Sequence, residues 1–217
     1  LAAGLAHEVR NPLNSATLQL QVLRRRVERG QNTPELLVPV VEIVHDEIRR
    51  LDRLVSDFLA FARPNPLVLE SVDLSELVAS VIAQLRPEAE AARVTIDLRL
   101  EQDSCIDGDP PRLRQIMLNL MRNGIDAMQA TPMVDRELLI RTAAVEDGIA
   151  VSVADRGGGI AQEAAERLFE PFFSTKPEGM GMGLNICRSI VESHKGRLWV
   201  EANPPGGSVF RFALPAA

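Results

Sequence analysis

Apolar residues recur every three or four positions in two separate runs near the start of the chain. In residues 13–27 and 37–62 the spacing alternates between three and four, which is the heptad pattern of packed helices. The intervening segment RGQNTPE favours a helix end, a turn and a new helix start. The pattern predicts an antiparallel α hairpin. Two helices cannot enclose two such seams, so we expect two hairpins to pair as a dimeric four-helix bundle.

Beyond residue 62 the periodicity changes. The segment RPNPLVLE contains two prolines, and we expect it to end the second helix and to form a linker over 63–69. Helical patterns around 74–90, 110–130 and 183–194 then alternate with strand-like runs at 94–100, 137–145, 149–155, 196–202 and 208–214. This mixture predicts an α/β sandwich in which helices cover one face of a sheet. The expected domains are therefore 1–62 and 70–217.

Composition narrows the possible functions. The chain has 217 residues, of which 46% are hydrophobic, so one or two domains can each bury a core. The net charge of −6 argues against general binding to nucleic acid. Cys105 and Cys187 lie far apart in apolar contexts, which predicts two buried thiols and no disulfide.

The same sequence suggests where the protein works. No apolar run reaches the length of a membrane span and no signal peptide is recognisable, so we expect this part of the protein to be cytoplasmic. The chain begins without Met and inside a helical pattern, so we expect a fragment whose upstream part is missing.

The segment GIAVSVADRGGGI ends a predicted strand in a carboxylate. Asp155 shares one strand face with three apolar residues, Ile149, Val151 and Val153. A carboxylate that extends a buried row needs hydrogen-bond donors, and the exocyclic amine of adenine could be one. The glycines that follow, Gly157 to Gly159, would let the backbone approach a planar ligand closely. A strand that ends in a simple Asp–Gly turn is the alternative.

A second glycine-rich segment, PEGMGMGLNICRSIVESHKG, leads directly into a helix. Its alternating glycines are Gly179, Gly181 and Gly183. Backbone amides at such a helix start can bind phosphate, although a flexible loop is also possible. The preceding segment LFEPFFSTK has the composition of a lid with apolar anchors and a basic tip at Lys176. Alternatively, Phe169 and Phe172 belong to the core.

A third segment, RLRQIMLNLMRNGIDAM, carries an unusual polar stripe. Asn119, Asn123 and Asp126 lie on one helix face, beside an apolar face formed by Leu113, Ile116 and Leu120. Lys and Glu would be usual on a solvent face, whereas an amide oxygen can bind Mg²⁺. An exposed polar face without a ligand is the alternative.

Together and in this order, the three segments resemble the N, G1, F and G2 boxes of sensor histidine kinases. The segment HEVRNPLN resembles the phosphoacceptor box of the same enzymes. The resemblance implies a dimeric hairpin domain followed by a catalytic domain of the Bergerat ATP-binding fold. It also implies ATP and Mg²⁺ as cofactors and the receiver domain of a response regulator as partner. The expected activity is autophosphorylation of His7 and transfer to an aspartate of that regulator.

The resemblance assigns roles by position. Asn123 corresponds to the magnesium ligand and Asp155 to the adenine ligand, and Asn119 and Lys176 are expected among the other nucleotide-binding residues. The glycines of the G1 and G2 boxes are Gly157, Gly159, Gly179, Gly181 and Gly183. The chain departs from many relatives at Met180 and Met182, which replace Thr and Leu, and at Asp126, which replaces Lys.

His7 lies next to the helix-breaking pair Asn11–Pro12. A helical residue advances about 100°, which places His7 on the side of the helix opposite the seam. The helix could instead begin at Asn11, but the apolar residues Leu5 and Val9 favour a continuous helix kinked at Pro12.

The residues beside His7 suggest how it would react. Neutral His7 would attack the γ-phosphate of ATP through Nε2, while Glu8 accepts the Nδ1 proton. Asn11 would position a water for dephosphorylation of the regulator, although it could also only relieve the kink.

Two other functions use the same fold. ATPases of the chaperone, gyrase and mismatch-repair type have a general-base Glu where this chain has Asn119, and an amide cannot take a proton from water. A catalytically inactive dimeric scaffold is the other alternative, against which the intact boxes and His7 argue. Of the other histidines, His45 borders the second seam, and His194 lies near a helix C-terminus, where a cation is favourable.

Overall fold

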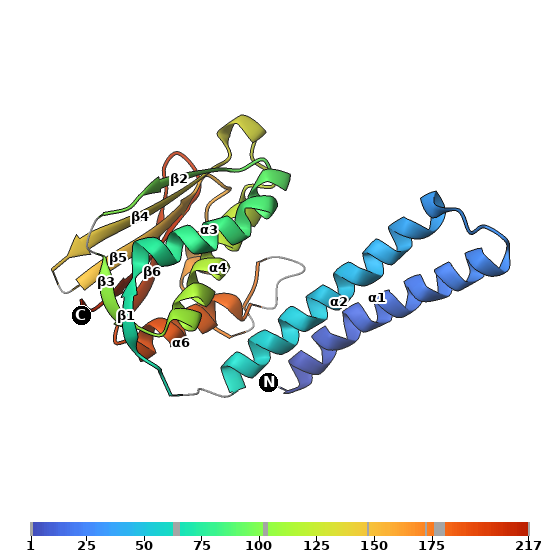
Figure 1. The fold of residues 1–217 in the computed structure, drawn as a ribbon, viewed down its shortest axis with the longest axis horizontal. Coiled ribbons are helices and arrows are strands. Elements are labelled where there is room, and N and C mark those ends of the chain that lie inside the picture. The colour runs from blue at the N-terminus through green and yellow to red at the C-terminus, as the bar shows by residue number, and fades with distance from the viewer. Residues whose placement is uncertain are drawn as a thin grey trace. The chain divides into compact units, whose positions relative to one another are not determined.

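The computed structural model describes residues 2–62, 66–101, 104–146, 148–171, 173–175 and 181–216. For residues 2–8, 53 and 56–62 it describes the backbone alone. The chain divides into two compact units, Leu1–Pro64 and Asn65–Ala217 (Figure 1).

The first unit is the predicted hairpin. Helix α1 (Ala2–Glu28) and helix α2 (Pro34–Ala62) are joined by a short turn, in which Gly30 adopts the left-handed conformation with φ 71°. Helix α1 continues through Pro12, so the prediction of a continuous helix is confirmed and a helix start at Asn11 is wrong. The side chains of His7 and Glu8 lie outside the described residues.

One heptad row of the hairpin is buried between the helices and another is exposed. Ala16, Val40 and Leu54 are at most 8% exposed. Large apolar side chains at every seventh position remain between 48% and 55% exposed, namely Leu13, Leu20 and Val27 on α1 and Val41, Ile48 and Val55 on α2. We call these six residues the exposed heptad row. A single hairpin therefore leaves this apolar row in contact with water.

The second unit contains a five-stranded sheet in the order β2-β4-β5-β7-β6. Strands β2 and β4 run parallel, and all other neighbours run antiparallel. The strands are β2 (Thr95–Arg99), β4 (Glu137–Val145), β5 (Gly148–Asp155), β6 (Arg197–Ala202) and β7 (Ser208–Leu214). Each corresponds to a strand predicted from the sequence.

Three long helices cover one face of this sheet, as Figure 1 shows, and complete the predicted α/β sandwich. They are α3 (Leu74–Ala91), α4 (Pro110–Ala127) and α6 (Gly183–Ser193). Asp73 begins α3 by accepting the backbone N–H groups of Ser75 at 2.7 Å and Glu76 at 3.3 Å. Helix α4 lies at the centre, because it contacts α3, α6, β4 and β5. Its buried residues include Leu113, Ile116 and Leu120, the apolar face expected beside the asparagines.

Several short elements were not predicted. Strands β1 (Glu70–Asp73) and β3 (Cys105–Gly108) form a separate antiparallel pair. A single-turn helix α5 (Gln162–Ala165) and a 3₁₀ turn (Met133–Asp135) complete the unit. Because Ile106 and Gly108 point inward on β3, Cys105 is exposed, so the expectation of two buried thiols is wrong for Cys105 and correct for Cys187.

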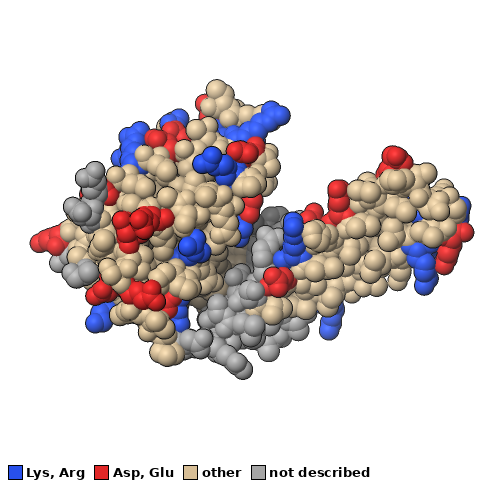
Figure 2. Space-filling view, viewed as in Figure 1, with Lys and Arg blue, Asp and Glu red and all other residues tan. Residues whose placement is uncertain are grey.

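The surface carries charges of both signs. Figure 2 shows acidic and basic side chains interspersed over the visible face of the second unit, without one sign dominating it. None of the helices in the described part of the chain is both long and apolar enough to cross a membrane.

Candidate functional site

Asp155 ends strand β5 as a buried carboxylate that is 2% exposed. Its Oδ1 accepts the backbone N–H of Gly157 at 2.8 Å and that of Ser208 at 3.3 Å. Two of the donors that a buried carboxylate requires are therefore backbone amides, one from the following turn and one from the start of β7. Both favour the ionised carboxylate, since each is aimed at the negative oxygen.

Helix α4 brings the asparagine stripe to the same end of the sheet. Asn119 and Asn123 are half-buried, whereas Asp126 is exposed. Gly124 lies close to Leu138 and Asp155, because a Cβ there would lie 2.5 Å from Leu138 Cδ1, which would have to shift, and 3.5 Å from Asp155 Cβ. The helical turn that carries Asn123 therefore packs directly against the end of β5 that carries Asp155.

The glycines after Asp155 differ in what they allow. A Cβ on Gly157 would lie 2.6 Å from the carbonyl oxygen of Ala127 at the end of α4, and Gly159 has φ 73°. A Cβ on Gly158 would meet nothing within 4 Å. The structure thus requires glycine at the two G1 positions named from the sequence, and this requirement comes from the fold itself.

Gly207 is a residue of the site that sequence reasoning missed. It has φ 107°, and a Cβ there would lie 2.0 Å from the backbone oxygen of Asp155. The Asn203 side chain also donates to that oxygen at 2.7 Å. The Gly–Gly pair before the last strand is the sequence feature that could have indicated this residue, but no local pattern relates the pair to Asp155.

The second glycine segment also reaches α4. Gly181 has φ 64°, and Gly183 begins α6 with its carbonyl oxygen accepting from Asn119 Nδ2 at 3.3 Å. Met182 is 2% exposed, so it packs as an apolar core residue. Gly179, Met180, Lys176 and Phe172 lie outside the described residues.

Helix α6 also holds the phenylalanine segment. Asn185 Nδ2 donates to the carbonyl oxygen of Phe169 at 3.0 Å, and the Arg188 guanidinium lies 6.0 Å from the centre of the Phe169 ring. Phe169 and Phe173 are both half-buried, and Arg167 lies 4.5 Å from the centre of the Phe173 ring. A cavity of about 320 Å³ borders this contact, but none of the predicted site residues lines it.

The two described histidine side chains have different environments. His45 is exposed on α2. His194 is 6% exposed at the end of α6, and its Nε2 accepts the backbone N–H of Asp109 at 3.0 Å. His194 therefore links the end of α6 to the start of α4, as its position near a helix C-terminus did not reveal.

Two family profiles match the chain. The family described as "Histidine kinase-, DNA gyrase B-, and HSP90-like ATPase" matches residues 108–217. The family described as "His Kinase A (phospho-acceptor) domain" matches residues 1–66. The first match includes the asparagine stripe, Asp155 and both glycine segments, and the second includes His7, Glu8 and Asn11.

Named relatives are similar over nearly the whole chain. Sporulation kinase C of Bacillus subtilis (strain 168) is 36% identical over 217 residues, which cover 99% of this chain and 48% of that protein. Sensor histidine kinase ZraS of Klebsiella oxytoca is 36% identical over 219 residues, which cover 99% of this chain and 45% of that protein. The chain thus spans about half the length of these relatives.

Solved structures share the arrangement. Histidine kinase ThkA, in complex with response regulator protein TrrA, aligns with a TM-score of 0.80 at 28% identity, over 100% of this chain and 61% of that chain. Full-length ShkA in complex with AMPPNP aligns with a TM-score of 0.71 at 30% identity, over 99% of this chain and 46% of that chain.

Proposed function

Because the chain belongs to the two-component sensor histidine kinases, we propose that it is a kinase core that transfers the γ-phosphoryl group of ATP to His7. The phosphoryl group then passes to an aspartate of a response regulator. The observation that carries the proposal is the convergence on α4 of the asparagine stripe, the buried Asp155 and the glycine turn that begins α6.

The chain's own groups fit a bound adenine nucleotide. An ionised carboxylate can accept several hydrogen bonds, so Asp155 suits the exocyclic amine of adenine as a donor in addition to the backbone N–H groups of Gly157 and Ser208. Gly157 lets the turn after Asp155 pack against the end of α4, because a Cβ there would lie 2.6 Å from the Ala127 carbonyl oxygen. At the other end of the site, the N-terminus of the 11-residue helix α6 and the glycines before it suit the phosphates.

Asn123 is the residue that would hold Mg²⁺, through its amide oxygen. Among the described residues, no group of three or more His, Cys, Asp and Glu side chains could hold a metal. Mg²⁺ often keeps several waters and takes its remaining ligands from one protein side chain and the nucleotide phosphates, which a single amide suits. When bound, the ion offsets charge on the transferring group.

The reaction proposed for His7 is a direct transfer of the phosphoryl group, in which one bond to phosphorus forms as another breaks. The Nε2 lone pair forms a bond to the γ-phosphorus as the bond from that phosphorus to its bridging oxygen breaks and ADP leaves. Glu8 accepts the Nδ1 proton, which leaves the phosphorylated imidazole neutral. A regulator aspartate then attacks the same phosphorus, and the P–N bond breaks.

The exposed heptad row supports a second copy of this chain as one partner, since pairing would bury it. A receiver domain is the other proposed partner, and a structural neighbour is a histidine kinase in complex with a response regulator. The upstream sensor of the full-length protein would supply the signal.

An ATPase is disfavoured by Asn119. Its amide donates to the Gly183 carbonyl at 3.3 Å, so it ties α4 to α6 at the position where those enzymes have a general base.

Incubation with γ-labelled ATP tests the proposal. We expect label on the protein that is stable in base and lost in acid, as for phosphohistidine. His7→Gln should abolish it while nucleotide binding survives, and His45→Gln, at an exposed position on α2, should retain it. Label that persists in His7→Gln would refute the assignment. Free phosphate without labelled protein would indicate an ATPase. The absence of both labelled protein and free phosphate would indicate an inactive scaffold.

A further inference from the structure

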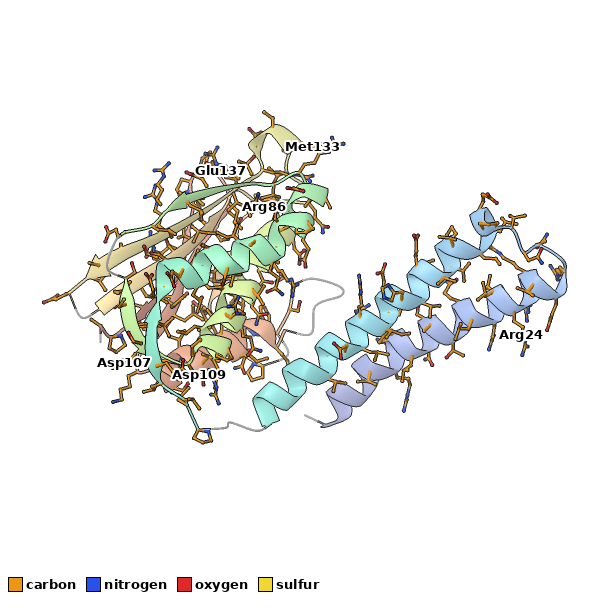
Figure 3. All side chains as sticks on the ribbon, in the orientation of Figure 1. Arg24, Arg86, Asp107, Asp109, Met133 and Glu137 are labelled. Carbon is orange, nitrogen blue, oxygen red and sulfur yellow. The ribbon has the colours of Figure 1, made fainter. Side chains whose placement is uncertain are left out.

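Asp109 joins three segments that are distant in the sequence. Its backbone N–H donates to His194 Nε2 at 3.0 Å. Its carboxylate accepts the backbone N–H of Val68 at 3.2 Å through Oδ2 and that of Arg112 at 3.2 Å through Oδ1. The Arg112 bond caps α4, and Asp109 is only 7% exposed. Figure 3 labels Asp109 where β3 passes into α4.

The hydrogen bonds of His194 specify one tautomer. Nε2 accepts from Asp109, and Nδ1 lies 2.8 Å from the carbonyl oxygen of Ile190, so the proton is on Nδ1. Both ring nitrogens are therefore used, and the ring links the end of α6 to the start of α4.

Helices α4 and α6 run antiparallel with contacts along their whole shared length. Asn119 bonds to Gly183 at one end, Cys187 Sγ lies 4.0 Å from the Ile116 carbonyl oxygen in the middle, and Asp109 meets His194 at the other end. Ten residues separate Asp109 from Asn119, which is about 15 Å of helix. Because close-packed helices slide as units, a shift at the Asp109 end moves the asparagines relative to the glycine turn.

We propose that Asp109 and His194 form a positioning junction, which holds α4 in register with α6 and ties both to the segment 66–69 at the entrance of the second unit. The junction sets the spacing between the asparagine stripe and Gly183. This proposal rests on the proposed function only because it assigns the nucleotide to the end of α4 and α6 that carries the asparagine stripe and Gly183. By linkage, a nucleotide that tightens the helix pair must also protect the Val68 amide.

Two substitutions of His194 separate positioning from packing. His194→Gln retains an acceptor that can reach the Asp109 N–H, whereas His194→Asn retains only the donor toward Ile190. We expect His194→Asn to weaken ADP binding in the presence of Mg²⁺ at least tenfold and His194→Gln to stay within about threefold. The ADP affinity is calculated per folded protein molecule. If His194 had a purely structural role, this corrected affinity would be the same in the variants and in the wild type.

Asp109→Asn provides a second test that does not alter the buried histidine. Asn still caps α4 through its one side-chain oxygen, but it cannot also accept from Val68. Hydrogen exchange should show faster exchange of the Val68 amide and no further protection by ADP. Arg112→Gln is the control, because it removes the guanidinium 3.5 Å from Oδ2 and leaves the Val68 bond in place.

The outcomes distinguish the junction from the kinase proposal. Equal ADP affinity in wild type and His194→Asn would overturn the junction, as would equal losses in the Asn and Gln variants. ADP binding without label on His7 would refute the kinase and leave this test intact. If the wild type bound no ADP, hydrogen exchange of the Ile186 amide, which donates to the Met182 carbonyl oxygen at the start of α6, would test the junction instead. His194→Asn must accelerate this exchange, and an unchanged rate would refute the junction.

Discussion

Gly181→Ala should destabilise the second unit far more than Gly183→Ala, although the two glycines belong to one motif. Gly181 has φ 64°, a region that costs an L-residue about 1–2 kcal/mol. A Cβ there would lie 2.3 Å from the carbonyl oxygen of Phe173, and such overpacking adds about 1–3 kcal/mol. We expect a loss of about 2 kcal/mol or more, which lowers Tm by roughly 4–8 °C for a domain of this size.

Gly183 provides the matched control. A Cβ there would lie 3.7 Å from Asn119 Nδ2, which is ordinary contact, and alanine favours the first turn of α6. Thermal unfolding without nucleotide should therefore leave Gly183→Ala equal to the wild type or slightly more stable. ADP affinity, measured separately, should fall about tenfold in Gly181→Ala, because the turn must move away from Phe173. A Gly181→Ala protein that melts within about 1 °C of the wild type would refute the reasoning.

Three further predictions concern single residues. Asn123→Ala should lose the Mg²⁺-dependent part of ADP affinity while the exposed Asp126→Ala retains it, and Kd values that respond to Mg²⁺ equally in both would reduce Asn123 to a packing residue. Asn11→Ala should keep autophosphorylation but slow dephosphorylation of the regulator at least tenfold, about 1.4 kcal/mol of barrier, and loss of autophosphorylation would instead indicate a structural role. Ile48→Glu, in the exposed heptad row, should sediment as a monomer at micromolar concentration, and Asp46→Ala, outside that row, should remain dimeric; a monomeric wild type would contradict the bundle.

The elements that the sequence predicted are those whose apolar positions recur at a regular spacing. Helices α1 and α2 and the five strands of the sheet repeat their apolar pattern over several periods, so local reading is enough. Strands β1 and β3 have four residues each, and their pairing brings Val72 opposite Ile106, which no local pattern relates. The exposure of Cys105 depends on that pairing and was missed with it.

The site divides in the same way. Asp155 and Gly157 were predicted because strand alternation and glycine chemistry are local properties. Gly207, the Ser208 amide and the contact between Asp109 and His194 were missed, since each depends on contact between distant segments. The functional roles of all site residues named from the sequence remain predictions, and the side chains of His7, Glu8 and Lys176 also lie outside the described residues.

The exposed heptad row makes the folding of the hairpin bimolecular if two copies pair as proposed. Its free energy then contains the protomer concentration, and each tenfold dilution removes about 1.4 kcal/mol of apparent stability per dimer. The second unit has its own buried core, including Phe212, Leu74 and Ile116, and carries no such dependence. The protein concentration therefore affects the stability of the hairpin and not that of the second unit.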